Sequence, residues 1–177
     1  TEFGSDNDHF SWPSDVAVDS EGTVFVSDSG TNHRVQVFAS NGLYLDTLGV
    51  TGVPYMTTPY LLNQPFAVSV DTEGNLYVVE GAGLRMQKFN ASGVFQWAYG
   101  TPGVFGSDEG YISDWWGGPE GKVAVAADGT VYLPDRSNHR VLILDSDGNL
   151  LDQLGVTRES SGENDHFSGP NGAAINP

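Results

Sequence analysis

The feature of this sequence that most limits its fold is an internal repeat. Copies that open with a proline begin at Pro13, Pro65, Pro119 and Pro170, which gives spacings of 52, 54 and 51 residues. Each complete copy continues with a short apolar run, a turn that contains an acid followed by glycine, and a second apolar run. Periods of roughly 20–50 residues are typical of solenoids, propellers and other arrays of one supersecondary unit.

Each copy is expected to contain four short strands. In the first copy three of them lie at 16–18, 24–26 and 35–38, and the fourth ends at Gly49. Glycine accepts the positive φ of a tight turn, so the X-Gly pairs between apolar runs predict hairpins. A β-sandwich is the rival fold, but its strands would not cycle in fours. The sequence therefore predicts an all-β β-propeller with four-stranded antiparallel blades.

The charge of the chain narrows the classes of partner. Seven Lys and Arg residues stand against 23 Asp and Glu residues, for a formal net charge of −16. Because nucleic-acid binding depends on Lys and Arg that meet phosphates, no nucleic-acid partner is expected. No apolar run approaches the ~18 residues of a membrane-spanning helix, so membrane insertion is not expected. The chain has no cysteine, which excludes disulfides and thiol chemistry.

Two loops carry a motif that resembles the NHL repeat. Asn-His-Arg-Val occurs at 32–35 and again at 138–141, and Pro-x-x-Val-Ala-Val-Asp occurs at 13–19. The second copy departs from this pattern, since it keeps Glu80 and Arg85 but lacks the Asn-His pair. The resemblance covers nearly the whole chain and implies a six-bladed propeller. NHL proteins include binding modules, RNA-binding modules, lyases and lactonases, so the resemblance implies a fold more firmly than a function.

The repeat also sets an expectation for domain organisation. We expect one propeller segment over 1–177, with blades at about 12–49, 64–100 and 118–155 and the start of a fourth at about 169–177. Residues 6–13 recur almost unchanged at 163–170, three blades later. Three blades cannot close a ring and leave strand edges uncovered. We therefore expect half of a six-bladed propeller, either within a longer polypeptide or completed by self-association.

Each copy places an acid before a polar loop and an arginine after it. The pairs are Asp28 with Arg34, Glu80 with Arg85, and Asp135 with Arg140. We interpret them as structural ion pairs across one hairpin, and the alternative is a ring of charge at one mouth of the channel. His33 and His139 lie in the same loops. We interpret both as hydrogen-bonded loop residues, with a metal ligand or a general base as the alternative.

Two turn sequences indicate further alternatives. Asp145, Asp147 and Asn149 resemble the opening of a calcium-binding loop, but a hairpin turn explains the same residues. Asn90 opens an Asn-Ala-Ser sequence and is a candidate for glycosylation. Beyond the calcium alternative we expect no metal, and we expect no cofactor.

The connections between copies, at 50–64, 101–118 and 156–169, are far longer than the ~2–6 residues that are usual. Because long loops on a rigid scaffold commonly carry binding residues, we predict a ligand face here. Its candidates are Tyr55, Tyr60, Phe105, Tyr111, Trp115 and Trp116, joined by His33 and His139. The alternative is that these rings pack back onto the blades.

An enzymatic role would need a catalytic constellation. The resemblance brings in amidating lyases, which use histidines just after the strand-one proline, but the corresponding residues here are Ser14, Phe66, Glu120 and Asn171. A lyase or lactonase would therefore need a metal site supplied by further blades. We expect instead a non-enzymatic interaction or structural module that binds a protein or glycan or builds an extracellular or cell-surface assembly. A cytoplasmic scaffold is the alternative.

Overall fold

The computed structural model describes residues 3–54, 58, 60–113, 122–160 and 163–175, and its regular structure is almost entirely β-strand. Three four-stranded antiparallel sheets follow one another along the chain, which confirms the propeller blades that the repeat predicts. The first blade contains β1 (Pro13–Val18), β2 (Val24–Asp28), β3 (Arg34–Phe38) and β4 (Tyr44–Leu48). The second contains β5 (Pro65–Val70), β6 (Leu76–Glu80), β7 (Arg85–Phe89) and β8 (Phe95–Tyr99). The third contains β9 (Ala124–Val125), β10 (Val131–Asp135), a turn of 3-10 helix (Arg136–Asn138), β11 (Arg140–Leu144) and β12 (Leu150–Leu154).

The turns within a blade are held by short side chains. In the β1–β2 turn, Oδ1 of Asp19 accepts hydrogen bonds from the backbone N–H groups of Glu21 (2.9 Å) and Thr23 (2.8 Å). Strand β1 begins before the expected residue 16, because a bulge near its start keeps Pro13 paired with Asp28. This early start extends β1 as far as the end of β2, where Asp28 lies.

Apolar side chains pack between neighbouring blades. Val78 and Phe89 of the second blade are fully buried in one cluster with Phe25 and Leu48 of the first blade and Leu62 of the connecting loop. Burial of an apolar side chain of this size contributes roughly 1.5–3 kcal/mol. A second cluster joins the second and third blades, and its fully buried members are Tyr77, Val79, Met86, Val131, Leu133, Leu142 and Leu144.

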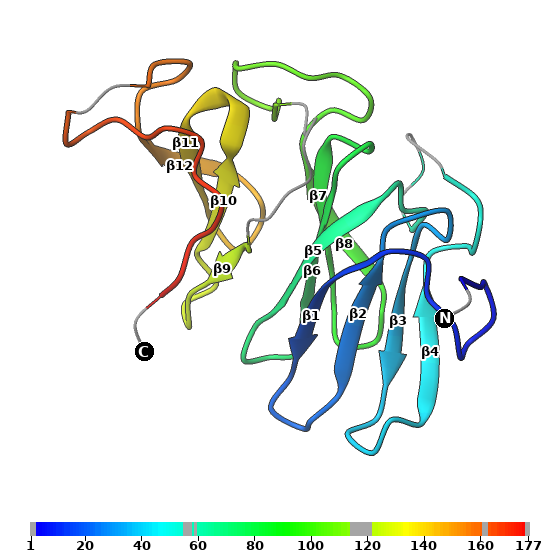
Figure 1. Ribbon diagram of the computed structural model, residues 1–177. Coiled ribbons are helices and arrows are strands. Elements are labelled where there is room, and N and C mark those ends of the chain that lie inside the picture. Colours follow the sequence, from blue (N-terminus) through cyan, green and yellow to red (C-terminus); the bar gives the residue numbers. More distant parts are fainter. Residues whose placement is uncertain (1–2, 55–57, 59, 114–121, 161–162, 176–177) are drawn as a thin grey trace.

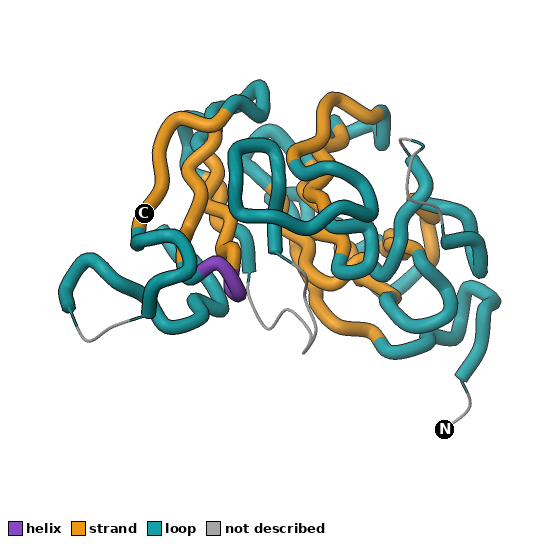
Figure 2. The backbone as a smooth tube through the Cα atoms, turned by 90° about the horizontal axis from the view of Figure 1, so that it is seen from above, coloured by secondary structure: helices purple, strands orange, loops and turns teal. Residues whose placement is uncertain are grey.

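The strands run between two ends of the molecule. We name one end the turn face, and its hairpin turns are at 19–23, 39–43, 71–75, 90–94, 126–130 and 145–149. The opposite end, the long-loop face, holds the β2–β3 type loops and the connections between blades. Figure 1 shows the turns of the first blade at the lower edge and the long connections at the upper edge. Figure 2 looks down onto the long-loop face.

Candidate binding face

A buried ion pair lies at the long-loop end of the first blade. Nε of Arg34 donates to Oδ2 of Asp28 at 2.9 Å, and the side chains are 1% and 0% exposed. The same carboxylate accepts a hydrogen bond from the backbone N–H of Ser11. The guanidinium also donates to the backbone carbonyls of Asp6 (2.7 Å) and His9 (2.9 Å). The pair therefore fastens the segment before β1 to the β2–β3 hairpin.

The same arrangement recurs in the other two blades. Arg85 donates to Glu80 at 2.7 Å, and Arg140 donates to Asp135 at 2.8 Å. Each arginine also donates to backbone carbonyls of the long connection before its own blade, and the closest acceptors are Leu61 and Ser107. These carboxylates are 0% exposed, so they present no ring of charge to a ligand. They hold the long connections onto the blades.

Glu80 shows the balance within such a pair. Burial raises the pKa of its carboxyl above the ordinary value for glutamic acid. Hydrogen bonds from Arg85, Gln87 and the backbone of Asn63 oppose that rise. A buried carboxylate is tolerated when its lone pairs are satisfied in this way.

The two loop histidines join one blade to the next. Nδ1 of His33 accepts a hydrogen bond from the backbone N–H of Gln64 at 3.1 Å, and Nδ1 of His139 accepts one from Gly169 at 3.0 Å. Gln64 directly precedes Pro65 of the second blade, so the contact ties the β2–β3 loop of the first blade to the start of β5. Burial lowers the pKa of His33 below its ordinary value, which favours the neutral ring that such an acceptor requires.

The predicted aromatic candidates divide into separate groups. Phe105 is 64% exposed and Tyr60 is 51% exposed. The Tyr60 ring makes an edge contact with Phe95, whose centroid is 5.9 Å away. Tyr111 is half-buried and lies over Gly106, where an added Cβ would meet it at 3.0 Å. Tyr55, Trp115 and Trp116 lie outside the described residues.

The structure adds an aromatic pair that the sequence analysis did not single out. Trp12 is 70% exposed and stacks on Phe3, which is 74% exposed, with ring centroids 6.2 Å apart and planes 9° apart. Trp12 directly precedes Pro13 and has a φ of 60°. The corresponding residues before later strand-one prolines are Gln64 and Gly169. A tryptophan at a position that is elsewhere polar or small is the signal that could have found it.

The remaining candidates lie on the turn face. Oδ1 of Asp145 accepts hydrogen bonds from the backbone N–H groups of Asp147 (2.9 Å) and Asn149 (2.8 Å). Asn90 makes the equivalent turn in the second blade, with hydrogen bonds from Ser92 and Val94. Within the described ranges, no group of three His, Asp or Glu side chains converges to hold a metal ion. The hairpin turn accounts for the contacts of Asp145 without a cation.

Blades of four antiparallel strands, each with a buried acid–arginine pair, define a propeller repeat protein. Residues 10–38 match the family model of the NHL repeat, so this part of the chain is an NHL repeat. Peptidyl-glycine alpha-amidating monooxygenase B of Xenopus laevis is 33% identical over 90 residues, which cover 50% of this chain and 10% of that protein. Human (Homo sapiens) teneurin-4 is 24% identical over 156 residues, which cover 75% of this chain and 6% of that protein.

A solved structure shares the same architecture. Kuenenia stuttgartiensis hydrazine synthase superposes with a TM-score of 0.62 at 15% sequence identity, over 90% of this chain and 38% of that chain. At this identity the likeness shows the propeller fold alone. The chain spans a tenth or less of the length of the two curated relatives named above. No helix in the described parts of the chain is long and apolar enough to cross a membrane.

Proposed function

We propose that this chain is a non-enzymatic interaction module whose long-loop face binds a protein or glycan partner. The observation that carries the proposal is the exposure of two large aromatic rings on this face, with Trp12 70% and Phe105 64% exposed. Aromatic rings supply much of the binding energy in protein interfaces. Their exposure leaves area that a partner can cover.

The scaffold beneath these rings supports the same proposal. The buried pairs Asp28–Arg34, Glu80–Arg85 and Asp135–Arg140 hold the connections that carry them, through backbone carbonyls. Binding residues that are held in place before the partner arrives lose less conformational entropy on binding. We therefore assign the three acid–arginine pairs the role of holding the segments of the long-loop face in position.

We place the module outside the cell or at the cell surface, where it would build part of a larger assembly. The net charge of −16 keeps such a chain soluble, which this location and the cytoplasm both allow. Fractionation of producing cells tests it. The chain should appear in the medium or the surface fraction, and recovery in the cytoplasm alone would support the cytoplasmic scaffold.

The experiment for the binding face compares three variants on an oligosaccharide array. Phe105→Ala and Trp12→Gln remove exposed rings, and Trp12→Gln installs the residue type that the second blade carries at the same position. Leu43→Ala, on the turn face and 64% exposed, is the control. We expect binding about tenfold weaker for the first two variants and unchanged binding for the control.

A protein partner gives the second arm of this experiment. If no oligosaccharide binds, photo-crosslinking residues at positions 105 and 43 are compared in the native source, and a partner should attach only at 105. The proposal fails if neither arm shows binding at the long-loop face. It also fails if Leu43→Ala weakens binding as much as the other variants.

A further inference from the structure

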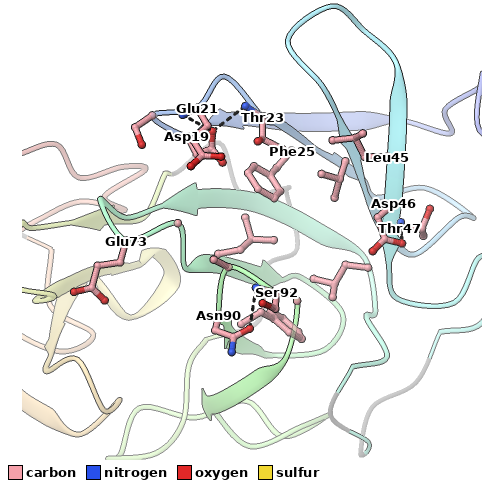
Figure 3. Close-up of a pocket in the computed structure, with 18 of the residues that line it drawn as sticks. Asp19, Glu21, Thr23, Phe25, Leu45, Asp46, Thr47, Glu73, Asn90 and Ser92 are labelled. Atoms are coloured by element: carbon pink, nitrogen blue, oxygen red, sulfur yellow. Dashed lines mark hydrogen bonds between the residues drawn. The ribbon is translucent and has the colours of Figure 1, made fainter.

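The turn face contains an open groove between the first two blades. Its volume is about 570 Å³. Its floor is apolar and includes Phe25, Leu48 and Leu76. Figure 3 shows Phe25 and Leu45 beside the groove, with Asp19, Glu21, Asp46 and Glu73 around its rim. Its described lining contains four carboxylates and no Lys, Arg or His.

The backbone fixes two of these carboxylates in place. Asp19 accepts hydrogen bonds from the N–H groups of Glu21 and Thr23, and Asp46 accepts one from Thr47 at 2.8 Å. Glu21, Asp46 and Glu73 are exposed at the rim. A concave apolar floor with negative charge at the rim favours a ligand that is both apolar and cationic.

The neighbouring groove shows how the protein fills the equivalent space itself. Between the second and third blades the groove is only about 290 Å³. There Nζ of Lys88 donates to the carbonyl of Ser146 at 3.1 Å and lies 5.2 Å from the centroid of the Tyr77 ring. Nε1 of Trp97 donates to the same carbonyl at 2.9 Å, and its indole packs against Gly148. An ammonium and an indole thus bridge the two blades.

The repeat aligns the two grooves residue by residue. Lys88 pairs with Trp97 across β7 and β8, and Val37 pairs with Asp46 at the corresponding positions of β3 and β4. The open groove therefore has valine in place of the lysine and aspartate in place of the tryptophan. Phe25 takes the place of Tyr77 in its floor, so a ring that can accept a cation is present.

We propose that the groove between the first two blades binds a basic segment of another protein, which inserts a lysine or arginine beside an aromatic side chain. The inserted pair takes the positions that Lys88 and Trp97 hold in the neighbouring groove. Its cation meets the rim carboxylates and the face of Phe25, and its aromatic ring covers the apolar floor. This site lies at the opposite end from the long-loop face and stands independently of binding there.

The test is a titration of the isotope-labelled chain with the blocked tripeptide acetyl-Gly-Lys-Trp-amide, followed by amide chemical shifts. We expect saturable shifts confined to the groove, at Thr23, Leu45, Thr47 and Gly93. The affinity should fall as sodium chloride is added, because the contact is partly ionic. Acetyl-Gly-Glu-Trp-amide should cause no saturable shift. Spermidine, which carries charge without an aromatic ring, should bind at least tenfold more weakly than the lysine peptide.

Two variants test the position of the site. Val37→Lys with Asp46→Trp transplants the intramolecular pair of the neighbouring groove, and we expect at least a tenfold loss of peptide affinity. Glu21→Gln with Glu73→Gln keeps the groove open and changes only exposed residues, and we expect a severalfold loss. Asp8→Asn with Glu109→Gln removes two exposed carboxylates elsewhere and should leave the affinity unchanged.

Several results would overturn the proposal. One is the absence of any saturable shift with the lysine peptide, and another is a set of shifts that maps outside the groove. Equal affinity for spermidine and the lysine peptide would show that charge alone is bound. Unchanged peptide affinity in the folded Val37→Lys, Asp46→Trp variant would show that the groove is not the site.

Discussion

The buried arginines are the residues on which the fold should depend most. Arg34→Met keeps much of the side-chain volume but leaves Asp28 buried without its cation and removes the donor to the carbonyls of Asp6 and His9. Loss of one partner of a buried pair costs about 3–5 kcal/mol. We expect a decrease of this size in the free energy of unfolding, measured by urea denaturation with tryptophan fluorescence.

Lys122 provides a matched control for this prediction. Its Nζ lies 3.0 Å from Oδ1 of Asp15, but its side chain is 61% exposed. An exposed ion pair contributes about 0–1 kcal/mol, so Lys122→Met should change the free energy of unfolding by no more than that. Equal losses in the Arg34 and Lys122 variants would contradict the role given to the buried pair.

His33 should make stability depend on pH. Its folded-state pKa is lowered by burial, so the native state binds fewer protons at this ring than the unfolded state. Its contribution is complete above the unfolded pKa of about 6.5 and is lost as the pH falls through the lower folded pKa. Protonation also abolishes the acceptor for the N–H of Gln64.

The measurement is the urea midpoint at about pH 7.5 and about pH 5.5 for the native chain and for His33→Asn. Asparagine tolerates the φ of 52° at this position but does not titrate in this range. The native chain should lose more stability on acidification than the variant. The pKa of His166 is raised by Asp165 and Glu159, which acts in the opposite direction in both proteins and cancels in the comparison. Identical pH dependence in the two proteins would refute the prediction.

At the scale of the element, the end of the fourth strand requires glycine. Gly100 has a φ of 103°, and an added Cβ would lie 2.5 Å from the carbonyl oxygen of Leu84 and 2.8 Å from Cα of Arg85. Gly42, in the β3–β4 turn, has a φ of 84° with nothing within 4 Å of an added Cβ. Backbone strain costs both alanine variants about 1–2 kcal/mol.

Gly100→Ala should therefore destabilise the chain well beyond Gly42→Ala, because only the first variant also forces backbone atoms apart. Thermal unfolding by circular dichroism makes the comparison, and we expect a Tm several degrees lower for Gly100→Ala than for Gly42→Ala. Equal Tm values would mean that the blade relaxes around the new methyl group. The close approach of the fourth strand to the β6–β7 loop would then not be a fixed feature of the blade.

The elements could be predicted from the sequence because their signals are local. Hairpin turns such as 19–23 and the apolar strands beside them are set by residues close in the chain. The spacing of Asp28 and Arg34 predicts that these two residues form an ion pair. The backbone carbonyls that Arg34 also binds could not be predicted, because no side-chain pattern in the sequence marks them. Whether a loop ring is exposed, as Phe105 is, or half-buried, as Tyr111 is, depends on the path of the whole connection.

The two grooves of the turn face show a second limit. The difference between Val37 and Lys88, or between Asp46 and Trp97, is visible in the aligned copies. The structural consequence of this difference follows only from the strand register, which places the two residues of each pair side by side and next to the following blade. Contacts across blades are tertiary, so the open groove could not be predicted from one copy of the repeat.

At the scale of the whole molecule, the described structure leaves the outer faces of the first and third blades without a blade against them. Val16 and Val18 are 48% and 55% exposed. They lie on the face of β1 opposite Ala17, which packs toward the second blade. On the third blade Leu154 is 46% exposed and pairs with Val141, on the face away from the second blade. The second blade has the same two faces, but there the first blade covers one of them and the third blade covers the other.

We therefore expect this polypeptide to associate in solution through these outer faces. Two copies related by a two-fold axis can set the first blade of each against the third blade of the other and so close a ring. Sedimentation velocity over a range of concentrations should show the associated species, and Val18→Lys should shift it toward monomer because a lysine would enter an apolar contact. Leu43→Lys, also exposed but on the turn face, should not. Only Val18 lies on a blade face that is buried at the corresponding place in the second blade. A monomer at every concentration would therefore contradict the expectation, and so would equal dissociation in the Val18 and Leu43 variants.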